Sequence, residues 1–375
     1  MAETILVTGG AGFIGSFLVD ALVEQGHRVR IYDALVPQVH GPEQTPPDYL
    51  NPGAEFVKGD VRNREVLARA LEGVEVVFHL AAAVGVGQSM YQIQYYTEAN
   101  TLGGAVLLDL LANTRHQVRK MLVASSMSIY GEGKYECEGC GVVTPRLRPE
   151  AQLKAREWEM KCPHCGRDAY PVPTDEDKPL FPTSIYAITK RDHEEMFLST
   201  GLAYGIPAVA LRFFNTYGPR QALSNPYTGV MAIFSGRLLN RQPPVIYEDG
   251  RQSRDLTHVS DIVHGLLLAM ERPAADYQVL NLGTGIPTSI GQVAEMLSQY
   301  LTGGEVKPEI RHQFRAGDIR HCYADLTKAR ALLGFEPRIS LQDGLDDLLT
   351  WVKGQTAVDR FAQVEKELAS KSLVV

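Results

Sequence analysis

The N-terminal segment constrains the fold most narrowly, because it holds an apolar strand, a glycine-rich turn and an amphipathic helix in that order. The apolar run 4–8 precedes Gly-Gly-Ala-Gly-Phe-Ile-Gly at 9–15, and apolar residues at helical spacing follow. Glycines at such a turn let the backbone approach a pyrophosphate, and the helix start supplies amide donors. The order predicts a dinucleotide site on a parallel sheet, with these residues at the cofactor: Gly9, Gly12, Phe13, Ile14 and Gly15.

The strands that follow predict the rest of the cofactor site. A strand over 28–32 ends at Asp33, whose carboxylate can accept hydrogen bonds from an adenosine ribose and would repel a 2′-phosphate. This favours NAD over NADP, although Asp33 could also be a simple turn cap. A helix is expected over 98–111, and His79 is expected to be a core histidine. The further residues predicted to contact NAD are Asp60, Val61, Leu80, Ala81, Ala82 and Asn100.

Tyr186 and Lys190 are the candidate catalytic pair. They are four residues apart, so they lie on one face of a helix. An ammonium beside a phenol favours the phenolate, so Lys190 is predicted to lower the pKa of Tyr186 and to let it exchange a proton with a sugar hydroxyl. A buried strand over 120–125 delivers Ser125 and Ser126 to the same sheet edge, where a serine can bind a substrate hydroxyl; capping of the strand end is the alternative.

Together these motifs resemble the extended short-chain dehydrogenases/reductases of the nucleotide-sugar epimerase/dehydratase family. The resemblance covers nearly the whole chain apart from one insertion. It implies an α/β fold: a Rossmann-type doubly wound parallel sheet with a smaller α/β C-terminal substrate domain. It also implies that Ser126 is the catalytic serine, that Tyr186 is the acid/base, and that Lys190 both tunes Tyr186 and holds the nicotinamide ribose. The matching pieces are 8–15, Asp33, 59–62, 79–82, Asn100, 125–126, 130–131, Tyr186 and Lys190.

The insertion lies between Ser126 and Tyr186 and contains two Cys-x-x-Cys pairs. Four thiolates make a closed tetrahedral site that suits structural zinc, with iron or a redox dithiol as alternatives. Zinc ribbons also bind nucleic acid, but segment 146–161 mixes acidic and basic residues, so we expect a small helix packed on the host domain. We also expect the insertion to form a wall or lid over the sugar site. The predicted metal ligands are Cys137, Cys140, Cys162 and Cys165.

The second half of the chain carries the predicted substrate residues. The segments around 211–220, 254–261 and 315–325 resemble family motifs, which imply that Asn215 reaches the substrate and that Arg254 and Arg315 clamp a diphosphate. Planar guanidinium groups suit that task. Either arginine could instead form a surface ion pair, and Asp255 and Asp318 are expected to be structural partners.

The net charge of −7 argues against a general nucleic-acid or anionic-membrane surface, and no apolar run approaches a membrane span. The chain begins with a strand rather than a signal peptide, so we expect a cytoplasmic protein. The resemblance implies a homodimer formed through helices near 98–113 and 185–200. The expected domains are a Rossmann domain at 1–131 and 179–214 with a return segment near 258–285, the insertion at 132–178, a nucleotide-sugar-binding domain at 215–257 and 286–358, and a tail at 359–375.

Positions 127 and 128 bear on the reaction. Dehydratases resembling this family carry Asp-Glu there and decarboxylases a glutamate at the second position, whereas this chain has Met127 and Ser128. The resemblance therefore implies a 4-epimerase that oxidises the sugar to a 4-keto form and returns the hydride to the opposite face. The insertion and segment 220–229 are most similar to members that interconvert dTDP-L-rhamnose and dTDP-6-deoxy-L-talose.

Three alternatives stay open. One is a UDP-glucose or UDP-N-acetylglucosamine 4-epimerase, and the next is a nucleotide-4-ketosugar reductase, against which Asp33 counts. The third is a non-catalytic protein that senses NAD or binds nucleic acid through its zinc ribbon. That last alternative must explain why Ser126, Tyr186 and Lys190 occur together.

Overall fold

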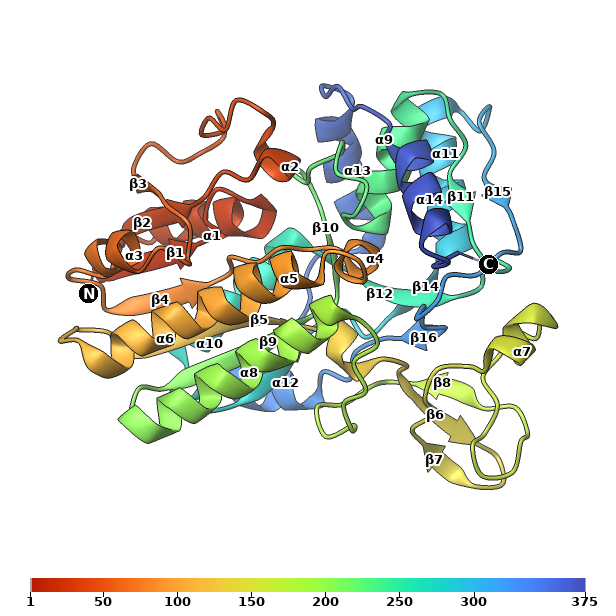
Figure 1. The fold of residues 1–375 in the computed structure, drawn as a ribbon, viewed down its shortest axis with the longest axis horizontal. Coiled ribbons are helices and arrows are strands. Elements are labelled where there is room, and N and C mark those ends of the chain that lie inside the picture. Colours follow the sequence, from red (N-terminus) through yellow and green to blue (C-terminus); the bar gives the residue numbers. More distant parts are fainter. Residues whose placement is uncertain (1, 375) are drawn as a thin grey trace.

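A seven-stranded parallel sheet forms the centre of the computed structural model, which describes residues 2–374 (Figure 1). The strand order is β13-β9-β5-β4-β1-β2-β3, so the winding reverses between β1 and β4. In open α/β sheets, ligands bind at the carboxyl ends of the strands at such a reversal. The predicted Rossmann-type class is confirmed. The strands are β1 (Thr4–Thr8), β2 (Arg28–Asp33), β3 (Glu55–Lys58), β4 (Val76–His79), β5 (Lys120–Ser126), β9 (Ala208–Phe213) and β13 (Val279–Leu282).

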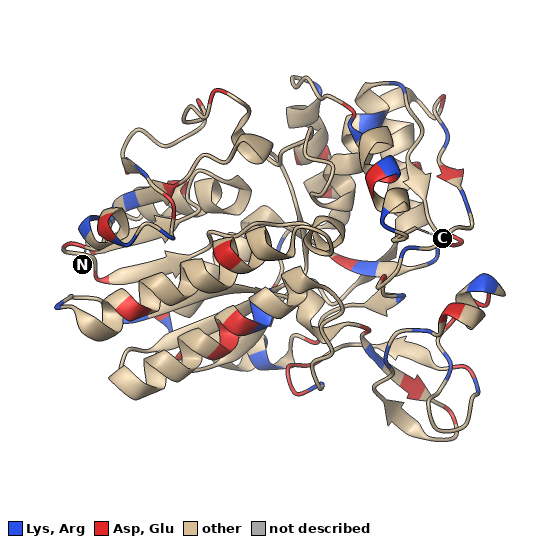
Figure 2. Ribbon diagram, viewed as in Figure 1, with Lys and Arg blue, Asp and Glu red and all other residues tan. Residues whose placement is uncertain are grey.

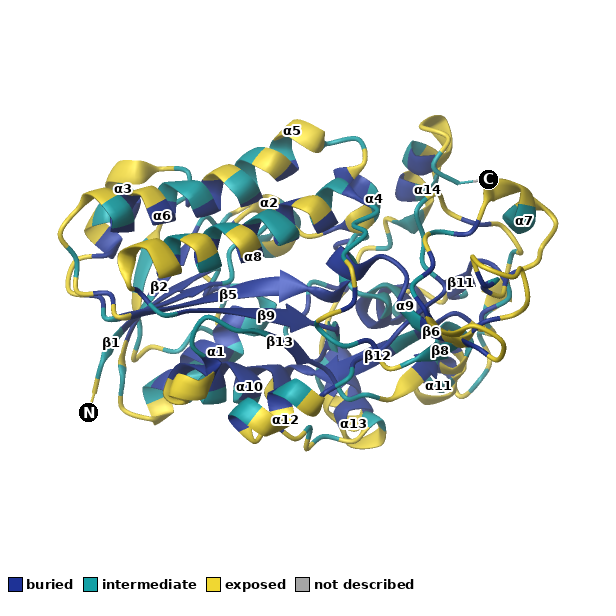
Figure 3. Ribbon diagram, turned by 90° about the horizontal axis from the view of Figure 1, so that it is seen from below, coloured by how far each residue is buried: buried dark blue, intermediate teal, exposed yellow. Residues whose placement is uncertain are grey.

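The central strands are apolar because helices cover both faces of the sheet. Neither β1 nor β4 contains a Lys, Arg, Asp or Glu (Figure 2). Along β1, Ile5 and Val7 belong to one core cluster and Leu6 to the cluster on the opposite face. Figure 3 shows the two layers. One consists of α3 (Arg64–Ala70), α6 (Gly103–Asn113) and α8 (Ile185–Tyr204), and the other of α1 (Phe13–Glu24), α10 (Val259–Glu271) and α12 (Thr327–Leu333).

Helix α8 is delimited by its own sequence. Ser184 accepts a hydrogen bond from the amide of Ala187 as an N-cap, and Gly205 ends the helix in a left-handed conformation at φ 68°. The helix packs along β5 and β9 and contacts α6. Its first turn therefore lies at the carboxyl edge of the sheet, where β5 ends.

A second lobe packs on that carboxyl edge. Its core lies between helices α9 (Val230–Leu239), α11 (Ile290–Thr302) and α13 (Leu341–Val352). Its longest strand, β12 (Ser253–His258), pairs with three short neighbours. These neighbours are β10 (Asn215–Tyr217), β14 (Pro287–Ser289) and β16 (His321–Cys322). A separate two-stranded sheet consists of β11 (Val245–Ile246) and β15 (Glu309–Ile310). The exact domain boundaries stay a prediction.

The insertion is a small antiparallel unit that projects from one end of the molecule (Figure 1). Its strands β6 (Lys134–Cys137), β7 (Gly141–Val143) and β8 (Tyr170–Val172) pair in the order β7-β6-β8. Segment 146–161 does form a small helix, α7 (Glu150–Lys154), but the expectation that it packs on the host domain is wrong, because none of its residues is buried. The buried side chains flank this helix instead, at Arg148 and Trp158.

Short elements complete the described chain. The helix expected over 98–111 begins as a π-helix over Thr97–Leu102 before it continues as α6, and such π segments often occur at functional sites. Among residues 2–374, no helix is long and apolar enough to cross a membrane. The other elements are α2 (Pro37–His40), α4 (Val86–Ser89), α5 (Ile93–Tyr96), α14 (Phe361–Ser370) and the 3-10 turns Met127–Tyr130 and Pro273–Ala275.

Candidate active site

The glycine loop packs too tightly for side chains. Gly9 has φ +73°, and a Cβ atom on it would lie 2.8 Å from the amide nitrogen of Ala81. A Cβ atom on Gly15 would lie 2.2 Å from the carbonyl oxygen of Gly9. Gly12 precedes α1 and brings no capping side chain, so the first amides of α1, which begins with Phe13 and Ile14, are available to an anion. This backbone cradle fits a dinucleotide pyrophosphate.

Asp33 joins β2 to the glycine loop. Its carboxylate is buried and accepts hydrogen bonds from the amides of Ala11 at 3.1 Å and Leu35 at 2.9 Å. Asp60 lies beyond the end of the neighbouring β3, where Arg62 donates to its carboxylate and lowers the pKa of Asp60. Val61 is buried beside it. The predicted adenosine-side residues therefore stand along one edge of the sheet.

Asn100 ties the loop after β4 to the catalytic helix. Its Oδ1 accepts from the amide of Ala83 at 2.7 Å, and its Nδ2 donates to the carbonyl of Ala83 at 3.1 Å and to Oγ1 of Thr189 at 2.9 Å. The loop between β4 and Ala83, which contains Leu80, Ala81 and Ala82, is thereby held beside α8. The fully buried His79 shares a hydrogen bond with Thr8, as expected of a core histidine.

The two serines at the end of β5 have different surroundings. Ser125 donates to the buried carboxylate of Glu194 at 2.9 Å. Ser126 accepts from the amide and hydroxyl of Ser128, at 3.2 and 2.9 Å. Its hydroxyl also neighbours the Tyr186 phenol: burial raises the pKa of that phenol, and the contact with Ser126 opposes the rise. The structure thus brings Ser126, rather than Ser125, to the tyrosine.

The first turn of α8 places Tyr186 and Lys190 on one face. The amide of Tyr186 donates to Oγ of Ser89 at 3.0 Å, and Nζ of Lys190 donates to the carbonyl of Ala124 at 2.9 Å. The predicted lowering of the tyrosine pKa by Lys190 is wrong for this arrangement, because burial raises the pKa of Tyr186. Burial also lowers the pKa of Lys190 to about 7, so this lysine is largely uncharged above neutral pH.

The predicted substrate residues lie on the second lobe. Oδ1 of Asn215 is buried and has no hydrogen-bond partner among residues 2–374. Arg315 pairs with Asp318 at 2.7 Å, and Arg254 lies 3.9 Å from the same carboxylate. Asp318 therefore holds the two arginines together, as expected of a structural partner. Asp255 is also structural, because it accepts from three backbone amides, those of Thr284, Gly285 and Ala324.

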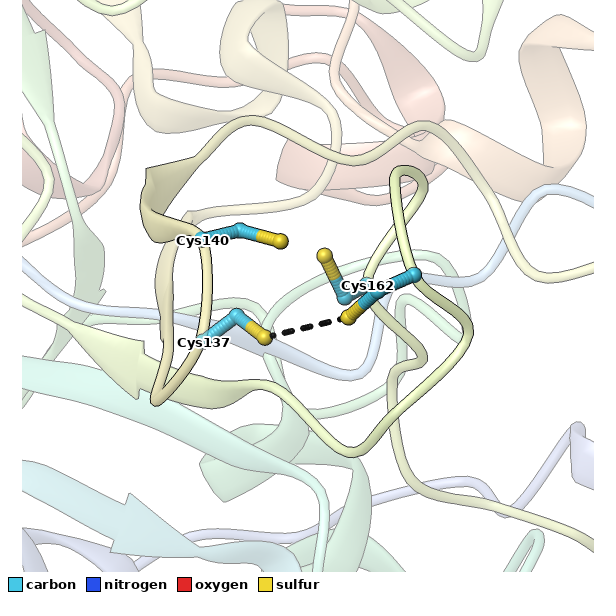
Figure 4. A group of neighbouring side chains, drawn as sticks. Cys137, Cys140 and Cys162 are labelled. Atoms are coloured by element: carbon cyan, nitrogen blue, oxygen red, sulfur yellow. Dashed lines mark hydrogen bonds between the residues drawn. The ribbon is translucent and has the colours of Figure 1, made fainter.

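The four cysteines of the insertion converge, and Figure 4 labels three of them, Cys137, Cys140 and Cys162. The sulfur atoms of Cys137, Cys140, Cys162 and Cys165 all lie within 4.8 Å of one another. Sγ of Cys137 is 3.5 Å from Sγ of Cys165. Hydrogen bonds from Arg167 lower the pKa of the Cys165 thiol to about 6. The donor set is four thiols around one point, which suits a tetrahedral metal ion.

Comparison with known proteins agrees with this geometry. A sequence model of the NAD dependent epimerase/dehydratase family matches residues 5–148, and one described as GDP-mannose 4,6 dehydratase matches residues 166–348. A dTDP-L-rhamnose 4-epimerase from Burkholderia thailandensis is 34% identical over 93% of this chain and 95% of its own. The chain belongs to the NAD-dependent epimerase/dehydratase family. The prediction of an extended short-chain dehydrogenase/reductase of the nucleotide-sugar epimerase type is therefore confirmed.

Solved structures of this family extend the likeness to the fold. The UDP-glucose 4-epimerase of Thermotoga maritima, determined with UDP-glucose, is 32% identical with a TM-score of 0.76, and the alignment covers 93% of this chain and 98% of that one. The UDP-glucuronic acid 4-epimerase of Bacillus cereus, determined with UDP-glucuronic acid and NAD, is 28% identical with a TM-score of 0.75, over 93% and 99%. The family assignment supports NAD as the cofactor.

One feature near the site could not be found from sequence. Helix α14 in the C-terminal tail brings Glu367 against two tyrosines, accepting hydrogen bonds from Tyr91 at 2.9 Å and from Tyr227 at 2.8 Å. Tyr91 follows α4, whose Ser89 binds the amide of Tyr186. No local pattern in the polar tail predicts this contact, because the partners lie at least 140 residues away.

Proposed function

We propose that this protein is a nucleotide-sugar 4-epimerase that oxidises the sugar at C4 transiently and returns the hydride to the opposite face. The observation that carries the proposal is the grouping of Ser126, Tyr186 and Lys190 at the carboxyl edge of the sheet, the edge at which β1 leads into the glycine loop. Positions 127 and 128 add no acid/base pair: Met127 is buried, and Ser128 donates to Ser126. A third reacting group for dehydration is therefore absent from this turn.

In this proposal Tyr186 takes the proton of the sugar C4 hydroxyl, and Ser126 donates a hydrogen bond to the same oxygen. NAD, when bound, supplies the hydride acceptor and donor. The residues that would hold it are those of the glycine loop with Asp33, Asp60, Val61, Asn100 and Lys190. The 4-keto sugar then rotates in the site and presents its opposite face, and Tyr186 returns the proton to the oxygen.

The substrate is bound by its diphosphate and its sugar. Arg254 and Arg315 would take the diphosphate, since guanidinium groups match phosphate oxygens. The unpartnered Oδ1 of Asn215 would accept a hydrogen bond from the substrate. The 34% identity to a dTDP-L-rhamnose 4-epimerase favours dTDP-L-rhamnose and dTDP-6-deoxy-L-talose as the pair. UDP-glucose is the second candidate, on the likeness to an enzyme solved with that sugar.

For the insertion we propose a structural zinc ion held by the four cysteines. Four sulfur ligands close the coordination shell and leave no position for substrate or water, so the ion would stabilise the fold without taking part in the chemistry. The small core of the insertion supports this proposal, because it contains few large apolar side chains: Tyr135, Val143 and Met160. Such a unit needs a further source of stability.

The proposed homodimer would pair α6 and the preceding π-helix with α8. Large apolar side chains on these elements are exposed, among them Leu102 at 48%, Ile188 at 43% and Leu202 at 67%. A cytoplasmic location stays a prediction from the sequence.

The test is proton NMR of the purified protein with dTDP-L-rhamnose, UDP-glucose and UDP-N-acetylglucosamine in separate tubes. A new anomeric signal that grows to an equilibrium mixture, without added cofactor, is expected with one of them. Tyr186→Phe is the matched control: it should bind NAD but leave the sugar unconverted. Conversion by Tyr186→Phe at the wild-type rate would contradict the tyrosine mechanism. A product that has lost a water molecule would show that the reaction is a dehydration and not an epimerisation.

A further inference from the structure

The insertion is joined to the second lobe by a cluster of charged side chains, here called the arginine–carboxylate cluster: Arg148, Glu159, Glu248, Asp249 and Arg320. Arg148 and Glu159 come from the segment between the two cysteine pairs, and the other three residues belong to the second lobe. Arg148 is buried and forms a two-point ion pair with the buried Glu248, with Nη1–Oε2 at 3.0 Å and Nη2–Oε1 at 2.8 Å. The insertion is therefore attached through ionic contacts of fixed geometry.

Arg320 is the hub of the cluster and is fully buried. Its Nη1 donates to Glu248 at 2.9 Å and to Asp249 at 2.7 Å, and its Nη2 donates to Glu159 at 2.6 Å and to Asp249 at 3.0 Å. Without Glu159, Arg320 would keep Glu248 and Asp249 but would lose its one carboxylate from the insertion, so the guanidinium would be free to shift toward the second lobe. The position of Arg320 therefore depends on Glu159, which the insertion supplies.

The backbone beside Arg320 orients Arg254. Nη1 of Arg254 donates to the carbonyl of Arg320 at 3.0 Å and to that of Ser253 at 2.8 Å, and Nη2 donates to the carbonyl of Ile319 at 2.8 Å. The amide of Arg320 is held in turn by the buried carboxylate of Glu132 at 2.7 Å. A shift of Arg320 would move its own carbonyl and that of Ile319 and turn the guanidinium of Arg254 with them.

We propose that Arg148 and Glu159 are positioning residues for Arg254, so that the insertion sets the affinity of the second lobe for the diphosphate of its ligand. Two contacts lead from the insertion to Arg320: Glu159 binds Arg320 directly, and Arg148 binds Glu248, which in turn binds Arg320. The carbonyls at 319–320 then bind Arg254. The inference rests on the proposed function, in which Arg254 binds that diphosphate. It gives the insertion a role in substrate binding that differs from that of a lid over the sugar.

The test uses the full-length, NAD-loaded protein and measures the dissociation constants of UDP and dTDP by calorimetry, together with KM and kcat for the active sugar. The variants are Glu159→Gln and Arg148→Met, with Arg148→Lys as the conservative partner. Glu150→Gln is the matched control, because Glu150 is an exposed acid on α7 of the same insertion, paired only locally with Lys154. Glu159 is itself half-exposed, so its variant tests the proposal even where Arg148→Met fails to fold.

The expected result is a nucleoside diphosphate affinity about tenfold weaker in Glu159→Gln and Arg148→Met, or about 1.4 kcal/mol. KM should rise in step while kcat and NAD content stay unchanged. Arg148→Lys should recover part of the affinity, and Glu150→Gln should match the wild type. In an Arg254→Gln background the effect of Glu159→Gln should disappear, because the two changes act on one contact.

Wild-type affinity in both insertion variants would overturn the inference, as would effects that add fully to those of Arg254→Gln. A joint fall of kcat, NAD content and affinity would also overturn it, because general unfolding would then explain the loss. If the wild-type protein binds neither UDP nor dTDP, the proposed function fails before any variant is compared, and the inference fails with it.

Discussion

Ser125 donates a hydrogen bond to Oε2 of the buried Glu194 at 2.9 Å, although Ser125 directly precedes the candidate catalytic Ser126. Glu194 also pairs with the buried Arg212, so Ser125 belongs to a structural ion-pair network. The adjacent hydroxyl of Ser126 instead neighbours Tyr186. The two serines therefore form a natural pair of test and control.

Ser126→Ala is expected to lower kcat by about 100-fold, which is the lower end of the effect that a positioned acid–base group has on the rate. Ser125→Ala should keep kcat and lower the free energy of unfolding by about 1–3 kcal/mol, since a buried carboxylate loses a donor. Steady-state kinetics and urea unfolding of both variants check this. Equal kcat losses in the two variants would show that the serines do not have separate roles.

Metal analysis tests the proposed zinc. We expect a single zinc per chain under reducing conditions, and its loss from Cys137→Ser and from Cys162→Ser, whose sulfur atoms belong to the cluster. Cys322→Ser should keep the metal, because Cys322 is the remaining cysteine and is buried in β16, outside the insertion. Zinc content in Cys137→Ser equal to that of the wild type would exclude the four-cysteine site.

The buried Lys190 predicts a pH dependence of stability. Its pKa is lowered to about 7 in the fold, whereas an unfolded lysine titrates near ~10.4. Between these two pH values the unfolded state binds more protons than the folded state. The free energy of unfolding contributed by this site therefore rises with pH and becomes constant above the pKa of the unfolded lysine. The stability of the wild type relative to Lys190→Met should rise by about 1.4 kcal/mol per pH unit across that window.

Urea unfolding of nucleotide-free protein at several pH values checks the prediction for Lys190. A gap between the wild type and Lys190→Met that stays constant above neutral pH would mean that Lys190 remains charged in the fold.

Glu367 is expected to hold α14 on the body of the protein. Its carboxylate accepts hydrogen bonds from Tyr91 and Tyr227, and hydrogen bonds to a charged group contribute about 1.5–3 kcal/mol each. Glu367→Ala should therefore speed hydrogen exchange of the α14 amides by at least about tenfold and leave α8 unchanged. Lys366→Ala, at the exposed neighbouring position, is the control. Identical exchange in the two variants would rule out a role for Glu367 in docking the helix.

Local sequence patterns indicate the candidate residues on the cofactor side of the site. The glycine loop, Asp33 and the pair Tyr186 and Lys190 are each specified within a few residues, because turn geometry and helical spacing are local properties. The family resemblance added the choice of Ser126 over Ser125; the structure places Ser126 beside Tyr186, and its catalytic role stays a prediction.

Features that depend on distant pairs were not predictable. Arg148 and Glu248 are 100 residues apart, and a charged residue in a mixed segment resembles any solvated one until its partner is known. The same applies to Glu367, which binds Tyr91 and Tyr227, and to Asn100, which binds Ala83 and Thr189. The pKa of Tyr186 was predicted in the wrong direction, because spacing along a helix does not reveal how deeply the phenol is buried.

The central claim is that C4 of the sugar loses and regains the same hydrogen, and epimerisation in D₂O tests it most directly. The converted sugar should carry no solvent deuterium at C4, and substrate deuterated at C4 should keep its label and react more slowly. Deuterium entering C4 from the solvent would contradict hydride transfer and would show that the carbon exchanges a proton instead.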